Sequence, residues 1–196
     1  MSSVMLNIST FLLIVACGAW ISMTLKKPLR WLAVMCLIVL SLILPAAGSN
    51  PWLWINGAAG ELSIVTLILL AVFILRSLAG INLLSFQTRR HLYFLLLLAG
   101  FMLYPATLGL TRFDPYILGF GLELTLLLLM LSVMYWFFQQ RQLALIFLIV
   151  VAADEAGTLS SLNTWDYLID PLLWLFTPAL LLIMFIDRRE RAKAGS

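Results

Sequence analysis

Three carboxylates lie within strongly apolar stretches, where an ionisable residue is a candidate for chemistry. Glu123 falls eight residues into an apolar run that begins at Pro115, and the pair Asp154 and Glu155 falls late in the following run. If both runs are helices that cross a bilayer, the rise per residue places Glu123 and Asp154 roughly 12 and 13 Å below the same edge of the apolar layer. We therefore expect a cluster of carboxylates in the outer half of a helical bundle.

Two kinds of chemistry would suit such a cluster. Carboxylates held close together in a low dielectric cannot all ionise, so a shared proton would fit a proton- or cation-coupled small transporter. Alternatively, their oxygens would hold Mg²⁺ or Ca²⁺ beside a lipid-linked phosphate, with Arg112 gripping the anion and Asp114 nearby. That second arrangement predicts a lipid-active transferase or hydrolase. Only this second hypothesis requires a divalent cation. Under the other hypotheses we expect no cofactor and no resident metal.

Structural roles for the same residues stay open. If the helix that carries Asp154 and Glu155 sits higher, both are ordinary interfacial charges, and Arg112 could form a salt bridge with a nearby carboxylate. Glu61 is expected in the first turn of a helix, where the helix dipole favours a carboxylate. Asp166 and Asp170 have helical spacing, but two acids alone are a weak metal signal.

Composition identifies the environment of these residues. The chain has 196 residues, of which 63% are hydrophobic and 11% charged, and its mean hydropathy is +1.07. A soluble domain of this length is about half apolar and about a quarter charged. The composition therefore excludes a soluble globular protein, a disordered chain and a nucleic-acid-binding module. Cys17 and Cys36 both lie in apolar runs, which excludes a disulfide scaffold.

The apolar runs predict an all-α, polytopic bundle of about seven transmembrane helices that forms one integral membrane domain over residues 1–196. The first span is expected to be retained, because it lacks the basic region of a cleaved signal peptide. Six spans, with one run re-entrant or in the interface, is the alternative. The seven expected spans are Val4–Leu25, Trp31–Ala47, Gly60–Leu78, Leu92–Leu110, Pro115–Phe138, Leu143–Leu162 and Pro171–Ile186.

Basic residues predict the orientation. Cytoplasmic loops are enriched in Lys and Arg, and eleven of the twelve basic residues follow the first, third, fifth and seventh spans, whereas the other loops carry only Arg112. The N-terminus is then outside and the C-terminus cytoplasmic. We expect a multi-pass protein of a bacterial inner membrane. His91, beside Arg89 and Arg90, is expected to belong to a basic edge that faces lipid headgroups.

Each expected outer loop ends in Asn-Pro or Asp-Pro. An Asn or Asp side chain caps a free backbone N–H, and proline is preorganised for the first helical position. We therefore expect three capped helix starts, at Asn50-Pro51, Asp114-Pro115 and Asp170-Pro171.

Motifs that would define an enzyme are not found in the sequence. The lone histidine leaves no paired haem ligands, no HExxH motif and no Ser-His protease, and we find neither a GxSxG elbow nor a P-loop. The first hypothesis for function is therefore an integral membrane accessory subunit of an envelope system for lipid or lipid-linked glycan modification, acting at the outer leaflet. Its expected partners are membrane lipids and another membrane protein or a second copy, and not a nucleic acid.

Overall fold

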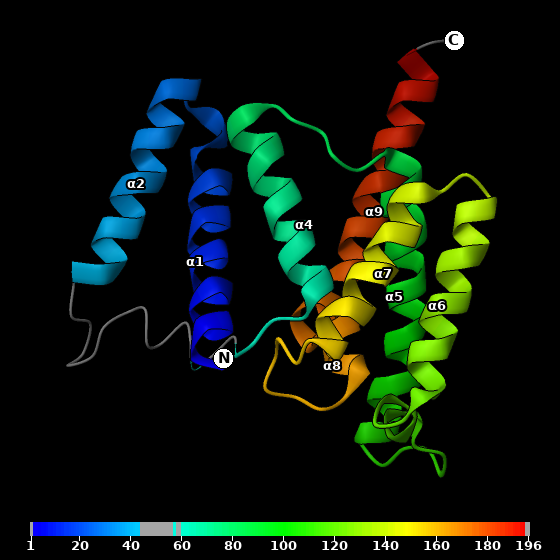
Figure 1. Cartoon of the computed structure of the whole chain (residues 1–196). Coiled ribbons are helices and arrows are strands. Elements are labelled where there is room, and N and C mark those ends of the chain that lie inside the picture. The colour runs from blue at the N-terminus through cyan, green and yellow to red at the C-terminus, as the bar shows by residue number, and fades with distance from the viewer. Residues whose placement is uncertain (1, 44–56, 58–59, 195–196) are drawn as a thin grey trace.

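The computed structural model describes residues 2–43, 57 and 60–194, and within them the fold consists of helices and their connections (Figure 1). The all-α prediction is confirmed for this part of the chain. The eight α-helices are α1 (Ser2–Ile21), α2 (Lys27–Ile43), α4 (Ile64–Ile74), α5 (Phe86–Thr107), α6 (Leu122–Phe137), α7 (Arg141–Glu155), α8 (Thr164–Leu168) and α9 (Pro171–Ala194). Short 3₁₀ or π turns occur at η1 (Ser22–Thr24), η2 (Leu75–Ala79) and η3 (Pro115–Gly119).

Among the helices of the described residues, one is long and apolar enough to cross a membrane by itself, over Val4–Ile21. Four other helices contain shorter apolar stretches of 10–17 residues, at Leu29–Val39, Ile64–Ala79, Leu122–Phe137 and Pro171–Ile186. A single apolar helix near an N-terminus is also typical of a signal sequence. Helix length and composition therefore support one membrane span in the described residues, and any further spans are part of the proposed function.

The long helices alternate in direction, so that connections expected on the same side gather at the same end (Figure 1). The α1–α2, η2–α5 and α6–α7 connections share one end with the C-terminal part of α9. We call this the basic end, and its described basic residues are Lys26, Arg30, Arg76, Arg89, Arg90, Arg141 and Arg188. The opposite end, which we call the acidic end, holds Glu61, Asp114, Glu123, Asp154, Glu155, Asp166 and Asp170.

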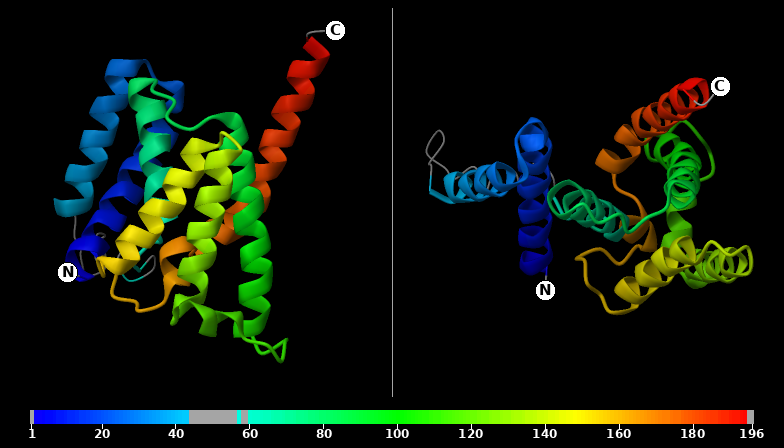
Figure 2. Two further views of the ribbon diagram at one scale, coloured as in Figure 1. Left: turned by 45° about the vertical axis from the view of Figure 1, so that its right-hand side comes forward. Right: turned by 90° about the horizontal axis from the view of Figure 1, so that it is seen from above.

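Two hydrophobic clusters hold the helices together. The larger cluster contains residues from each of the helices α4, α5, α6, α7, α8 and α9, with Leu92, Leu128 and Val150 among the most buried. The smaller cluster joins α1, α2 and η2 around Ala19 and Val34. Seen from above, α1, α2 and α4 stand apart from the pair α5 and α9 (Figure 2). The helix α4 packs against α1 and α7, whereas α9 packs against α5.

Besides shifts in helix bounds, two expected spans are not continuous helices in the structure, and both differences bear on the candidate site. The run over 115–138 is divided, because Gly121 is extended and α6 begins only at Leu122. The run over 143–162 ends at Glu155, because Gly157 adopts a left-handed φ of 57° and its N–H bonds back to the carbonyl of Asp154. Residues 158–163 then lead to α8 without forming a helix.

Two of the three expected caps are confirmed. The carboxylate of Asp114 accepts the N–H of Tyr116 at 3.0 Å, and that of Asp170 accepts the N–H of Leu173 at 2.8 Å. The third expected cap, Asn50-Pro51, lies outside the described residues.

Candidate functional site

The buried carboxylate of Asp170 lies where two helices begin. Its Oδ1 caps α9, while its Oδ2 accepts hydrogen bonds from the N–H of Ser63 at 3.1 Å and from the hydroxyl of Thr66. Ser63 is itself the N-cap of α4. Helix N-termini carry partial positive charge, so one negative group is stabilised by two of them. Asp170 therefore fixes the start of α9 against the start of α4.

The segment from Leu159 to Leu168 is attached to η3 by side-chain hydrogen bonds. Asp166 accepts the phenol hydroxyl of Tyr116 at 2.9 Å and the hydroxyl of Ser161. Asn163 caps α8 and donates to the carbonyl of Tyr116 at 2.9 Å, while the indole N–H of Trp165 donates to the carbonyl of Pro115 at 2.9 Å. These bonds orient the side chains at the acidic end.

Gly119 allows η3 and α8 to approach each other this closely. A Cβ atom at this position would lie 1.9 Å from Oδ1 of Asn163 and 2.7 Å from Cδ1 of Trp165. Both distances are far shorter than a van der Waals contact. Gly119 is therefore the position at which η3 and α8 come into close contact.

Two further carboxylates tie this segment to other helices. Glu61 lies before the Ser63 cap of α4 and not in the first turn of a helix as expected, and it accepts hydrogen bonds from the N–H and the hydroxyl of Ser160, both at 2.7 Å. Asp154, in the last turn of α7, accepts the hydroxyl of Thr164 at 2.5 Å. Each of these carboxylates bonds to a neutral donor of the chain itself, which gives all of them a role in holding the acidic end rigid.

These elements enclose a pocket of about 270 Å³ at the acidic end. Its lining includes the carboxylates of Glu61, Asp166 and Asp170 and the phenol rings of Tyr104 and Tyr116. Leucine and isoleucine side chains complete the wall. Acceptor oxygens beside aromatic rings can receive cationic groups or hydroxyl-rich groups such as sugars, whose O–H groups donate to carboxylates and whose apolar faces lie on rings.

Burial, followed by the hydrogen bond to the Asp166 carboxylate, raises the pKa of Tyr116 from 10.0 to about 12. The cause is that ionised Tyr116 would be less hydrated and would face a second negative charge. Tyr116 thus remains a hydrogen-bond donor to Asp166 at all physiological pH values.

The residues that the sequence grouped in one carboxylate cluster differ in exposure and in bonding. Glu123 is exposed in the first turn of α6, not eight residues along a continuous helix, and Glu155 is exposed at the last residue of α7. Within the described residues, no hydrogen bond joins Glu123 to Asp154 or Glu155. Arg112 and Asp114 are exposed in the connection between α5 and η3.

Of the expected site residues, Glu61 lines the pocket, whereas Asp154 lies outside its lining and bonds to Thr164 of α8. Asp166 and Tyr116, the central pair of the pocket, were not among the expected site residues. The aromatic residues around the Asp-Pro dipeptides are the sequence signal that points to them. Among the described residues, no group of three or more His, Cys, Asp or Glu side chains is arranged to hold a metal ion.

Comparison with known proteins gives no family for this chain: no family model matches it, and searches of curated proteins and of solved structures return no match.

Proposed function

We propose that this chain is a multi-pass integral membrane protein, with its acidic end at the outer face, that serves as an accessory subunit of a system handling lipids or lipid-linked glycans. A bacterial inner membrane is its proposed location. The observation that carries the proposal is the rigid pocket of carboxylates and phenol rings at the acidic end.

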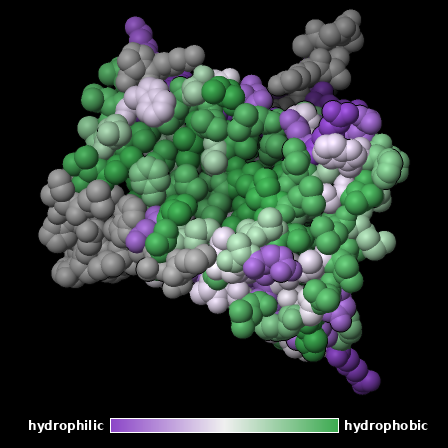
Figure 3. Space-filling model, in the orientation of Figure 1, coloured by the Kyte–Doolittle hydropathy of each residue, from purple (hydrophilic) through white to green (hydrophobic). Residues whose placement is uncertain are grey.

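Exposed apolar stripes support several membrane crossings. Along α6, Leu126, Met130, Val133 and Phe137 repeat at helical spacing and are between 56 and 77% exposed. Leucine and phenylalanine side chains on α9 are similarly exposed. Figure 3 shows apolar side chains across the middle of one face and hydrophilic ones toward its upper and lower parts. Such surfaces are unfavourable in water and suit contact with lipid chains.

The charge distribution supports the orientation. Translocation of positively charged loops is disfavoured, so the basic end is expected on the cytoplasmic side. The acidic end, with its pocket, then faces the outer leaflet and the compartment beyond it. Acidic residues contribute little to orientation, and their concentration at this end therefore favours a recognition role.

The bonding of the carboxylates favours recognition over proton transport. Asp154, Asp166 and Asp170 each accept hydrogen bonds from hydroxyl or helix-capping N–H groups of the chain itself. A proton carrier must instead exchange protons along a connected pathway. The fixed carboxylates and rings form a preorganised surface for a cationic or hydroxyl-rich group of a partner.

Affinity purification from native membranes in a mild detergent, followed by mass spectrometry, tests this function. We expect a stoichiometric membrane partner, and we expect Glu61→Gln combined with Tyr116→Phe to reduce its recovery severalfold. Glu123→Gln is the matched control, because Glu123 is exposed at the same end but does not line the pocket. Recovery of the chain alone, or equal recovery with the pocket variant, would contradict the proposal.

A further inference from the structure

A second and larger concavity lies toward the basic end, between the packed pair α1 and α4 on one side and the packed pair α5 and α9 on the other. This groove of about 770 Å³ is lined by α1, α4, α5 and α9. Its walls are mainly apolar and include Val72, Phe73, Leu180 and Ile183. The volume lies within the range of about 300–1,000 Å³ that is typical of ligand sites.

Three guanidinium groups line the same groove. Arg76 comes from η2, Arg89 from α5 and Arg188 from α9. The Nε atom of Arg89 is buried and has no hydrogen-bond partner within the described part of the chain. A buried donor without an acceptor is costly, so an acceptor from outside the chain is expected here.

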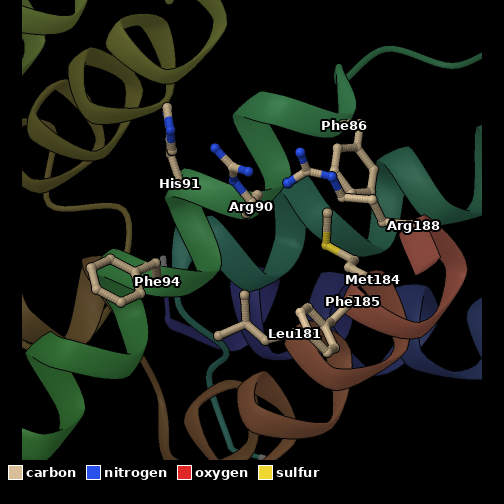
Figure 4. Close-up of a pocket in the computed structure, with 8 residues that line it drawn as sticks. All are labelled: Phe86, Arg90, His91, Phe94, Leu181, Met184, Phe185 and Arg188. Carbon is tan, nitrogen blue, oxygen red and sulfur yellow. The ribbon is translucent and has the colours of Figure 1, made fainter. Parts of the chain in front are cut away.

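A smaller pocket adjoins the groove and adds a fourth guanidinium group, that of Arg90. It shares Phe86, Met184 and Arg188 with the groove and has a volume of about 420 Å³. In Figure 4, the side chains of Arg90 and Arg188 reach toward each other across this pocket from α5 and α9. Two guanidinium groups that face one space repel each other unless an anion lies between them.

We propose that the groove binds an anionic phospholipid of the cytoplasmic leaflet. One acyl chain lies between α4 and α9 against Val72 and Ile183, and the phosphate accepts hydrogen bonds from Arg89 and Arg188. The apolar groove next to the guanidinium groups favours a phospholipid over a free phosphate ion, because it buries a chain as well as a charge. This inference rests on the proposed membrane placement, but not on the pocket at the acidic end.

Thermal unfolding of the purified chain in a neutral detergent tests the proposal. Phosphatidylglycerol is expected to raise the unfolding midpoint in a concentration-dependent way, because a ligand that binds the folded state stabilises it. Phosphatidylcholine with the same acyl chains, and inorganic phosphate, are expected to have little effect. Equal responses to the two lipids, or an equal response to phosphate alone, would overturn the proposal.

Variants identify the site. Arg89→Gln and Arg188→Gln are each expected to weaken the apparent affinity for phosphatidylglycerol about fivefold, and Arg89→Lys to restore part of it. Arg141→Gln is the control, since Arg141 lies at the same end outside the groove, over the ring of Trp136. A loss for Arg141→Gln as large as for Arg188→Gln would overturn the assignment.

A groove-filling variant tests the acyl chain separately. Ile183 is 54% exposed on the groove wall, so Ile183→Trp is expected to fold and yet to abolish the response to phosphatidylglycerol. A retained response would exclude the groove as the chain site. Because this assay needs no protein partner, its failure would leave the proposal for the acidic end unaffected.

Discussion

The backbone N–H of Ser63 donates a hydrogen bond of 3.1 Å to the carboxylate of Asp170, 107 residues further along the chain. Since Ser63 caps α4 and Asp170 caps α9, this bond and the one from the Thr66 hydroxyl to the same carboxylate couple the starts of the two helices. The residues around it form the wall of the acidic pocket. The stability of that end and the shape of its pocket therefore depend on the same carboxylate.

Asp170→Ala is expected to lower the free energy of unfolding by about 3 kcal/mol, because the N–H groups of Ser63 and Leu173 and the hydroxyl of Thr66 lose their acceptor in a buried place. Thermal unfolding of the purified protein in detergent measures the loss. The matched control is Asp114→Ala, at another Asp-Pro dipeptide whose aspartate is exposed. It should cost no more than about 1 kcal/mol, and equal losses would contradict a special role for Asp170.

Gly119→Ala is expected to cost about 2 kcal/mol, because its Cβ atom would overlap Asn163 and Trp165 and push α8 away from η3. Gly18→Ala serves as the comparison. A Cβ atom there would lie 3.3 Å from a methyl group of Val34, which is tight but can be relieved by a small shift. If the two variants unfold at the same temperature, η3 and α8 are not held as closely as described.

Tyr116 is expected to titrate near pH 12, two units above an ordinary tyrosine. Its folded-state pKa is raised, so its contribution to stability is fully present below pH 10 and is lost as the pH rises from about 10 through 12. The difference in tyrosinate absorbance between the wild type and Tyr116→Phe isolates this group. Asp166→Asn should lower the pKa of Tyr116, because it removes the negatively charged carboxylate that lies beside the phenol hydroxyl. An unchanged titration would contradict the bond.

Glu61 and Glu123 should respond differently to the same substitution. Glu61→Gln weakens two hydrogen bonds to Ser160 and is expected to cost about 1 kcal/mol, whereas Glu123→Gln should change stability by less than about 0.5 kcal/mol. Chemical denaturation in detergent compares them. A larger effect at Glu123 would instead favour the intramembrane carboxylate cluster that the sequence suggested.

The helices were predictable where their signal is local. Apolar runs located the long helices, and the Asp-Pro dipeptides marked the starts of η3 and α9, because caps act within a few residues. The early end of α7 was missed, because the expected span was extended to Leu162 although Gly157 and the polar residues Thr158, Ser160 and Ser161 carry a local signal for an end.

The candidate site was only partly predictable, because it depends on contacts between distant parts of the chain. Nothing near Asp166 in the sequence indicates that Tyr116, 50 residues away, donates to it. Likewise, the depth expected for Glu123 was calculated for one continuous helix from Pro115. In the structure the helix is broken at Gly121, and Glu123 is exposed in the first turn of α6.

Site-specific photo-crosslinking in native membranes tests the proposed recognition role of the acidic pocket most directly. A photoreactive amino acid at Thr107, on the rim of the pocket at the end of α5, should give one discrete adduct with a membrane partner or a lipid-linked glycan. The same amino acid at Gln87, exposed at the opposite end of the same helix, should not give that adduct. We expect the Thr107 adduct to disappear in the Glu61→Gln, Tyr116→Phe background. No adduct at Thr107, or the same adduct from both positions, would contradict a partner site at the acidic end.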